Sequence, residues 1–216
     1  MSDDGERIVF VAIDDAGRVP AWLATLNGSA PPRRLASIES VRTFFGANGD
    51  VFFMGGDEGP NKFLYHVNAD GSGLRKVFPD PIGYLYDVSP DARSVAVASR
   101  GSVVVVSVDR GSPTTVCQGC ADAGGENRGI TPPIVSWSRD GTFLYLRLAG
   151  VWAVPLKPGQ ILAPLPAGGI RRREEVAALP GARSIPKPLA FAGPNPEVYA
   201  FARVTTQRNI YRIPVP

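Results

Sequence analysis

A short polar turn followed by an alternating apolar strand recurs along the chain, and this repeat limits the folds that the chain can adopt. Its copies occupy residues 2–5, 47–50, 89–92, 138–141 and, in weaker form, 193–196. The first three steps are 44, 43 and 49 residues long, counted from Gly5 through Gly49 and Ala92 to Gly141. Asp and Gly tolerate a positive φ, and proline presets the first turn position, so each turn has a physical basis. A period of about 40 to 50 residues indicates a repeat architecture.

Each repeat contains four short strands. The stretch 64–99, LYHVNADGSGLRKVFPDPIGYLYDVSPDARSVAVAS, shows them within about one repeat length, separated by the turn at Asp70-Gly71, a linker and the turn at Ser89-Pro90-Asp91. Four strands per repeat at this period are typical of β-propeller blades. The sequence therefore predicts an all-β β-propeller, whose strands we label a to d from the axis outward.

The chain divides into about five four-stranded blade units within a single domain, 1–216. The predicted units are 1–40, 41–82, 83–130, 131–186 and 187–216. Unit 1 supplies strands b, c and d without a, and unit 5 supplies a, b and c without d. The two incomplete units overlap and cannot complement each other. One interpretation is an open five-unit ring; the one that we favour is the C-terminal fragment of a longer propeller.

The outer strands are short, and one segment departs from the strand pattern. The predicted outer strands are RRLA, LRKVF, TTVC and ILAPL, at 33–36, 74–78, 114–117 and 161–165. Residues 171–179 contain good helix formers and no Gly or Pro, and Pro180-Gly181 follows. We expect one short helix there, inside a loop between blades.

Composition supports this fold and excludes several classes of function. The 24 Gly and 21 Pro among 216 residues favour frequent turns, and the chain is long enough to bury a core without disulfides. The net charge is +3, and the only basic run, 171–173, is followed by Glu174 and Glu175, so we expect no nucleic-acid partner. No window of 18 apolar residues predicts a membrane segment, and MSDDGERIVF lacks the pattern of an export signal.

The only cysteines, Cys117 and Cys120, form a Cys-Gln-Gly-Cys motif. A zinc site needs four ligands, and His66 is the single histidine, so we expect no metal. A thioredoxin-like role requires a helix after the first cysteine, which the sequence does not indicate. We favour a local disulfide, which requires an oxidising compartment; two free thiols or a redox role are the alternatives.

No catalytic constellation is visible, and we expect neither enzymatic activity nor a cofactor. His66 lies within a strand, has no Ser or Asp beside it in a nucleophile setting, and is expected to be packed or hydrogen-bonded. Nucleophile-elbow, Walker, dinucleotide-binding and kinase motifs are absent. Among the predicted inner strands Asp87 is the only acidic residue, which argues against a hydrolase with a central metal.

Other polar and aromatic groups have structural explanations. The loop Asp70-Gly-Ser-Gly73 lacks the spaced carboxylates of a calcium site and suffices as a hairpin turn. The Asp residues of the Ser-Pro-Asp and Ser-Arg-Asp-Gly turns are expected to accept backbone N–H bonds within the turn. Six aromatic residues are expected to pack between blades rather than to form a ligand cage: Tyr84, Tyr86, Trp137, Phe143, Tyr145 and Trp152.

Two segments carry a resemblance to a known family. LYHVNADGSGLR at 64–75 and DVSPD at 87–91 resemble the TolB-like branch of the WD40-like (PD40-type) propellers, in which an N-A-D-G-S hairpin precedes an inner S-P-D-G turn. The resemblance extends over the whole chain as repeats. The resemblance indicates the fold but says little about function, because these motifs consist of turn-forming residues.

A narrower resemblance covers the last third. VSWSRDGTFLYL, VWAVPLKPGQILAPLPAGGI and PNPEVYAFARVTTQRNIYRIPVP resemble the C-terminal propellers that follow Ser/Thr kinase domains in some soil bacteria. This resemblance implies an extracytoplasmic or periplasmic propeller joined through a membrane helix to a cytoplasmic kinase. The Cys117–Cys120 pair fits the same pattern. The chain itself contains neither the kinase nor the membrane helix.

These observations predict a binding or sensing platform, with a protein or small ligand held on the loops between strands d and a and between b and c. The candidate loops are 57–61, 80–83, 122–131 and 170–173. Within them or beside them, Tyr84, Arg128 and Arg171 are the candidate contact residues, because Tyr and Arg are enriched at binding hot spots. The alternative is an accessory or lid propeller of a prolyl-oligopeptidase-like hydrolase.

Overall fold

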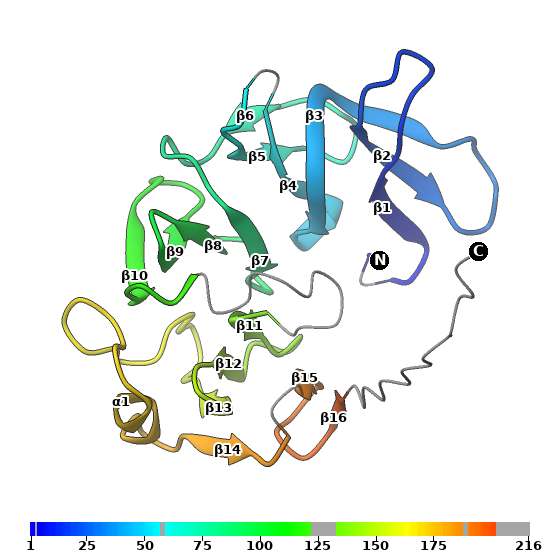
Figure 1. Cartoon of the computed structure of the whole chain (residues 1–216). Coiled ribbons are helices and arrows are strands. Elements are labelled where there is room, and N and C mark those ends of the chain that lie inside the picture. The colour runs from blue at the N-terminus through cyan, green and yellow to red at the C-terminus, as the bar shows by residue number, and fades with distance from the viewer. Residues whose placement is uncertain (3, 57–58, 122–132, 188–189, 202–216) are drawn as a thin grey trace, which may run out of the picture.

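The computed structural model describes residues 1–2, 4–56, 59–121, 133–187 and 190–201. Four antiparallel sheets lie around a common centre in chain order, as Figure 1 shows. Their short strands meet at tight turns, and their inner strands face the centre. The predicted all-β propeller architecture is confirmed.

The first sheet joins two units through one long strand. It consists of β1 (Arg7–Val11), β2 (Pro20–Thr25), β3 (Arg33–Phe45), β4 (Val51–Gly55), β5 (Phe63–Val67) and β6 (Arg75–Lys76). The first part of β3 pairs with β2 and the second part with β4, and the register shifts between Ser40 and Arg42. A single strand thus serves as the outer strand of unit 1 and the inner strand of unit 2, and it runs through the predicted unit boundary at residue 40. The 3-10 turn η1 (Ala47–Gly49) connects it to β4.

The next two sheets have the predicted order of four strands. Unit 3 contains β7 (Tyr84–Val88), β8 (Ser94–Ser99), β9 (Ser102–Ser107) and β10 (Pro113–Cys117). Unit 4 contains β11 (Val135–Trp137), β12 (Phe143–Arg147), β13 (Val151–Pro155) and β14 (Arg183–Ile185). Neighbouring strands in each sheet are antiparallel, as in propeller blades.

The outer strand of unit 4 was predicted wrongly. Residues 161–165 lie outside any strand, and β14 pairs with β13 instead. Pro164 has no N–H to donate to a ladder, and the segment is held by other contacts. The carbonyl of Ile161 accepts the indole N–H of Trp137 at 2.8 Å, and Ala163 is buried in the core.

Helix α1 (Arg173–Ala177) is shorter than predicted and lies inside unit 4, between β13 and β14, rather than in a loop between blades. Arg172 has an extended backbone, and the Glu175 carboxylate accepts the N–H of Arg171 and that of Arg172, at 2.6 and 3.3 Å. These bonds satisfy donors that the helix leaves free at its start. Val176 is fully buried and anchors the helix to the core.

The two end units are incomplete within the described residues. Unit 1 has β1, β2 and the first part of β3, and no described strand lies inside β1. Unit 5 has an inner strand, β15 (Ala190–Ala192), paired with β16 (Tyr199–Phe201). Its predicted third strand, at 209–216, lies outside the described residues. Among the described residues no helix is long and apolar enough to cross a membrane.

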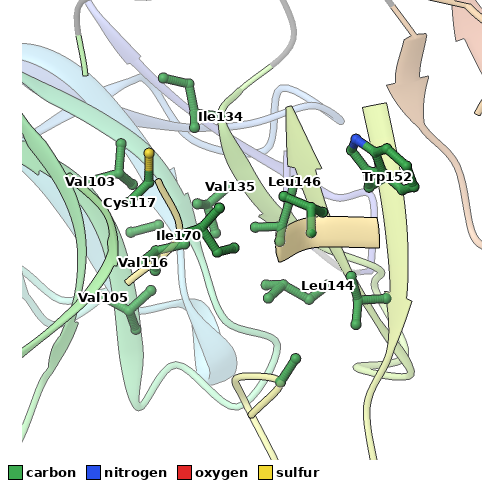
Figure 2. Close-up of a cluster of buried hydrophobic side chains, with 14 of the residues drawn as sticks. Val103, Val105, Val116, Cys117, Ile134, Val135, Leu144, Leu146, Trp152 and Ile170 are labelled. Atoms are coloured by element: carbon green, nitrogen blue, oxygen red, sulfur yellow. The ribbon is translucent and has the colours of Figure 1, made fainter. Parts of the chain in front are cut away.

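The apolar core lies mainly between neighbouring sheets. Figure 2 shows the interface of units 3 and 4, where Val103 and Val105 of β9 lie on one side and Leu144 and Leu146 of β12 on the other. Ile170, from the segment that precedes α1, packs between them. Further clusters join unit 2 to unit 3 and unit 4 to unit 5. Each unit is therefore held chiefly by its neighbours.

Replacing Leu144 by Ala tests this location of the core. Leu144 is fully buried between units 3 and 4, so we expect the free energy of unfolding to fall by about 2 to 5 kcal/mol. Leu74→Ala is the matched control, because Leu74 is exposed and its loss should stay within about 0.5 kcal/mol. Urea unfolding followed by circular dichroism measures both, and equal losses would contradict the assignment.

Candidate functional site

The turns that connect strands a and b share one hydrogen-bonding pattern. In unit 3 the N–H of Ser89 donates to the carbonyl of Ser94 at 2.8 Å, and the N–H of Ser94 donates back to the Ser89 hydroxyl at 3.0 Å. Ser138 with Phe143 in unit 4, and Ser2 with Arg7 in unit 1, form the same two bonds at 2.8 to 2.9 Å. The turns are therefore built alike in three units.

The aspartates of these turns are used locally, as predicted. Asp91 and Asp140 each accept the hydroxyl of the serine two residues earlier and the backbone N–H two residues later. The Ser138 hydroxyl is the main cause that lowers the pKa of Asp140, followed by the N–H of Thr142. Asp70 likewise accepts the N–H and the hydroxyl of Ser72, which confirms the hairpin turn.

A cavity of about 810 Å³ lies where these a-to-b turns meet at the centre of the ring. All five units contribute to its wall. The lining residues are Met1 and Val9 of unit 1, 43–47 of unit 2, 87–90 of unit 3, 137–139 of unit 4 and 192–194 of unit 5. The cavity therefore depends on how the units are arranged around the axis, and no single repeat contains it. We call it the axial cavity.

Asp87 is the acidic side chain of the inner strands in this wall. Its Oδ2 accepts the backbone N–H of Trp137 in unit 4 at 3.0 Å, and its Oδ1 accepts the N–H of Val88 at 2.9 Å. Burial raises the pKa of Asp87 to about 6, against the effect of these two donors and of the nearby Arg42. The carboxylate thus ties the inner strands of units 3 and 4 together.

A second cavity, of about 500 Å³, shares Pro90 and Trp137 with the axial cavity. It lies between the a-to-b turns of units 3 and 4 and the segment 156–161. The apolar side chains of Leu156 and Ile161 form part of its wall. The concave surface at this end of the ring therefore extends outward between two blades.

In the wall of the axial cavity, the hydroxyls of Ser89 and Ser138 donate to the turn aspartates Asp91 and Asp140. His66 lies elsewhere, on β5, where its Nε2 is 3.1 Å from Oδ2 of Asp50 and its ring packs 5.0 Å from that of Phe52. It is a packed, hydrogen-bonded strand residue, as predicted. Within the described ranges, no three His, Cys, Asp or Glu side chains gather in a way that could hold a metal. The lining of the cavity includes the Asp87 carboxylate and the aromatic side chains of Phe44, Phe45 and Trp137.

Two of the three predicted contact residues, Tyr84 and Arg171, do not line the axial cavity. Tyr84 is half-buried on β7, its ring 4.5 Å from the guanidinium of Arg42 and 4.9 Å from the ring of Tyr86. Arg171 is exposed beside α1, and Arg128 lies outside the described residues. Their role in binding stays a prediction.

The described parts of the predicted binding loops, 59–61, 80–83 and 170–173, lie at the opposite end of the strands from the a-to-b turns. Within them Asp80 forms an ion pair with Arg100 at 2.7 Å, and Ile170 is buried, with its backbone bridged to Cys117. Residues 57–58 and 122–131 are outside the described part of the chain. The axial cavity was missed because the recurring turns were interpreted only as turns. The turns occupy the same position in each repeat, and this pattern in the sequence could have shown that they meet at one end of the ring.

The aromatic residues mostly pack as predicted. Trp137, Trp152 and Tyr86 are buried in the cluster between units 3 and 4, and Tyr145 is buried at the interface with unit 5. Arg173 of α1 lies 5.6 Å from the Trp152 ring. Trp137 also lines the axial cavity.

Cys117 and Cys120 are joined as a disulfide in the structure, with their Cα atoms 5.9 Å apart. This Cα separation suits a disulfide. Both side chains are buried, and the following residue, Ala121, donates its N–H to the carbonyl of Gly101 at 3.2 Å. The pair therefore closes the outer strand of unit 3 against the turn between β8 and β9. Its oxidation in the cell stays a prediction.

Comparison with solved structures identifies the fold. The structure is similar to TolB from Acinetobacter baumannii, with a TM-score of 0.53 and 18% identity over 73% of this chain and 40% of that one. It is also similar to a putative TolB from Agrobacterium tumefaciens, with a TM-score of 0.51 and 16% identity over 74% of this chain and 57% of that one. The fold is a TolB-like β-propeller. No known family model matches the sequence, and no curated protein matches it.

These similarities confirm the TolB-like resemblance for the fold alone. The chain matches about half the length of the two TolB structures, 40% and 57%. At this identity the fold carries no statement about ligand or activity. The resemblance of the last third to kinase-associated propellers stays a prediction.

Asp87 makes the stability of the protein depend on pH. Its pKa is about 6 in the folded protein and 3.8 by ordinary value, so the folded state holds this proton more tightly than the unfolded chain. The protonated Asp87 side chain therefore contributes to the free energy of unfolding. This contribution is complete below about pH 4 and is lost as the pH rises through about 6. We expect the free energy of unfolding of the wild type, minus that of Asp87→Asn, to fall over this window. Urea unfolding at several pH values measures this difference, and a constant difference would contradict the raised pKa.

The disulfide is tested by alkylation in denaturant, which removes the protection that burial gives to the thiols. For protein exported to an oxidising compartment, we expect Cys117 and Cys120 to react with iodoacetamide only after reduction. Peptide mass spectrometry locates the label. The control is protein from a reducing cytosol, whose thiols should be labelled directly. Direct labelling of the exported protein would refute the disulfide.

Proposed function

We propose that this chain is a non-catalytic binding module that recognises a partner protein at the axial cavity. The observation that carries the proposal is that all five units contribute to this cavity, units 2 to 5 at their a-to-b turns and unit 1 through Met1 and Val9. A concave site with few polar groups on a rigid scaffold is the usual form of a binding site.

The chemistry of the wall supports binding rather than catalysis. Ser89 and Ser138 are buried, and their hydroxyl oxygens accept the backbone N–H groups of Ser94 and Phe143, so both serines serve to close the turns. The Asp87 carboxylate accepts two backbone N–H groups, one from its own strand and one from the next unit. These polar groups hold the wall in shape. The lining also includes apolar surface from Phe44, Phe45 and Trp137 that is suited to side chains of a partner.

The cellular setting of this module follows from the narrower sequence resemblance. We propose that it is the sensing or protein-interaction part of a bacterial signalling protein, and that it acts outside the cytoplasm. The proximity of Cys117 and Cys120 supports this setting, because a local disulfide forms in an oxidising compartment.

A pair of tryptophan substitutions in one hairpin tests the site. Ala192 is exposed in the wall of the axial cavity, whereas Ala200 is exposed on the paired strand β16 and does not line it. We would select binders from a random heptapeptide library with the wild-type protein. We expect Ala192→Trp to weaken their binding by about tenfold or more by filling the cavity, and Ala200→Trp to change it less than about twofold.

Fluorescence anisotropy with the selected peptides measures these affinities. Failure to enrich any peptide would contradict recognition of a polypeptide. Binding that is equally strong in Ala192→Trp would place the site elsewhere, including on the predicted loop face that contains Tyr84.

A further inference from the structure

The second cavity, between units 3 and 4, adjoins the axial cavity and differs from it in chemistry. Its volume is about 500 Å³, and its wall combines Pro90 and Asp91 of the unit 3 turn, residues 140–142 of the unit 4 turn, Trp137 and parts of the segment 156–161. We call it the flanking cavity. A concave space of this size is typical of ligand sites.

Hydrogen bonds hold the wall of the flanking cavity in place. The indole N–H of Trp137 donates to the carbonyl of Ile161 at 2.8 Å. The N–H of Leu156 donates to the carbonyl of Thr142, also at 2.8 Å. The segment 156–161 is therefore tied to the inner hairpin of unit 4 at both of its ends, and the cavity beneath it is preformed.

Two carboxylates in this wall use only one oxygen each within the protein. The Oδ1 atoms of Asp91 and Asp140 accept a serine hydroxyl and a backbone N–H within their turns. Among the described residues, no hydrogen bond ends on either Oδ2 atom. Both residues are exposed, and the donors around Asp140 hold its pKa below the ordinary value. The two Oδ2 atoms are therefore accessible acceptors that carry negative charge at neutral pH.

The flanking cavity favours a positively charged group on an apolar stem. Of the described residues, no Lys, Arg or His lines it, and Arg139, in the same turn as Asp140, lines the axial cavity instead. Trp137, Leu156 and Ile161 add aromatic and apolar surface to the wall. An aromatic ring attracts a cation, and apolar surface packs against the methylene groups that carry it.

We infer that the flanking cavity binds a Lys or Arg side chain of the partner protein whose main contacts lie in the axial cavity. The inference rests on the proposed function and specifies the class of partner, a polypeptide with a basic residue. Because the two cavities share Pro90 and Trp137, a segment bound in one can extend a side chain into the other. The ammonium or guanidinium group then donates to the Oδ2 atoms of Asp91 and Asp140.

Removal of the two negative charges tests the inference. In the double variant Asp91→Asn with Asp140→Asn, each amide keeps Oδ1 as the acceptor for its turn. Asp70→Asn is the matched control, because Asp70 uses Oδ1 in the same way between β5 and β6 and lines neither cavity. We expect heptapeptides selected with the wild type to contain Lys or Arg. They should bind the double variant about fivefold more weakly or worse, and Asp70→Asn within about twofold.

Substitutions at Gln160 test the sign of the charge without changing the turns. Gln160 is exposed in the wall of the flanking cavity. Gln160→Lys should weaken binding of the same peptides by about threefold, and Gln160→Glu should strengthen it by about twofold. A disturbance of the structure would weaken both. Equal binding by the three forms, or weaker binding by both variants, would refute the inference even if the double variant fails to fold.

A change in the peptide tests the same charge from the other side. Replacing its Lys by norleucine keeps the stem and removes the ammonium group, and citrulline does so for the guanidinium of Arg. Fluorescence anisotropy should show weaker binding to the wild type and little change with the double variant. Competition with free n-butylammonium is the second arm. Displacement of the peptide at equal concentration would make the flanking cavity a site for small amines and contradict a polypeptide partner.

The outcomes separate this inference from the proposed function. If the selected peptides bind the wild type and the double variant equally but fail to bind Ala192→Trp, the axial cavity is the site and this inference is wrong. If they bind Ala192→Trp normally and lose affinity for the double variant, the axial site is wrong and the pocket for a basic side chain remains. If no library peptide binds the wild type, both proposals fail.

Discussion

The structure depends on apolar packing between successive sheets. In unit 3, Val95 and Val97 of β8 face the cluster shared with unit 2, whereas Ala96 and Ala98 face the cluster shared with unit 4. Both faces of the sheet are therefore buried, which explains why β8 and β9 are continuous apolar runs rather than alternating ones. A unit of this kind cannot bury its side chains alone, so the order of units in the chain becomes their order around the axis.

Because the sheets are fixed by this packing, the turns at their inner ends are brought to one place. The serine of each turn closes the a-to-b hairpin, and its aspartate is used within the turn. The turns then form a rigid wall, and Asp87 links two of their inner strands by accepting the N–H of Trp137. The same residues that make the repeat recognisable in the sequence thus build the axial cavity. Unit 1 contributes Met1 and Val9 to the same wall.

Local chemistry explains which predictions were confirmed. The turns, the four-strand order in units 2 and 3 and the hydrogen-bonded His66 depend on residues close together in the sequence or on strand period. The outer strand of unit 4 was missed because two segments compete for the edge of β13, and only the tertiary structure shows which one reaches it. Residues 161–165 contain Pro164 and pack by their side chains. A Cβ at position 169 would lie 2.9 Å from the carbonyl oxygens of Thr115 and Val116. Because Gly169 has no Cβ, the chain can approach β10 this closely and continue along it.

The sequence by itself determined that this protein is a propeller of TolB-like repeats. Turn residues at a period of 43 to 49 residues, each followed by strands of apolar residues, leave few other ways to bury the chain. Only the tertiary structure decided where the axial cavity lies, the cavity that we propose as the binding site. The wall of the axial cavity combines residues from Met1 to Pro194, which lie far apart in the sequence. Strand period and turn chemistry depend on residues a few positions apart. A cavity assembled from five units can be located only when the packing of all five is known.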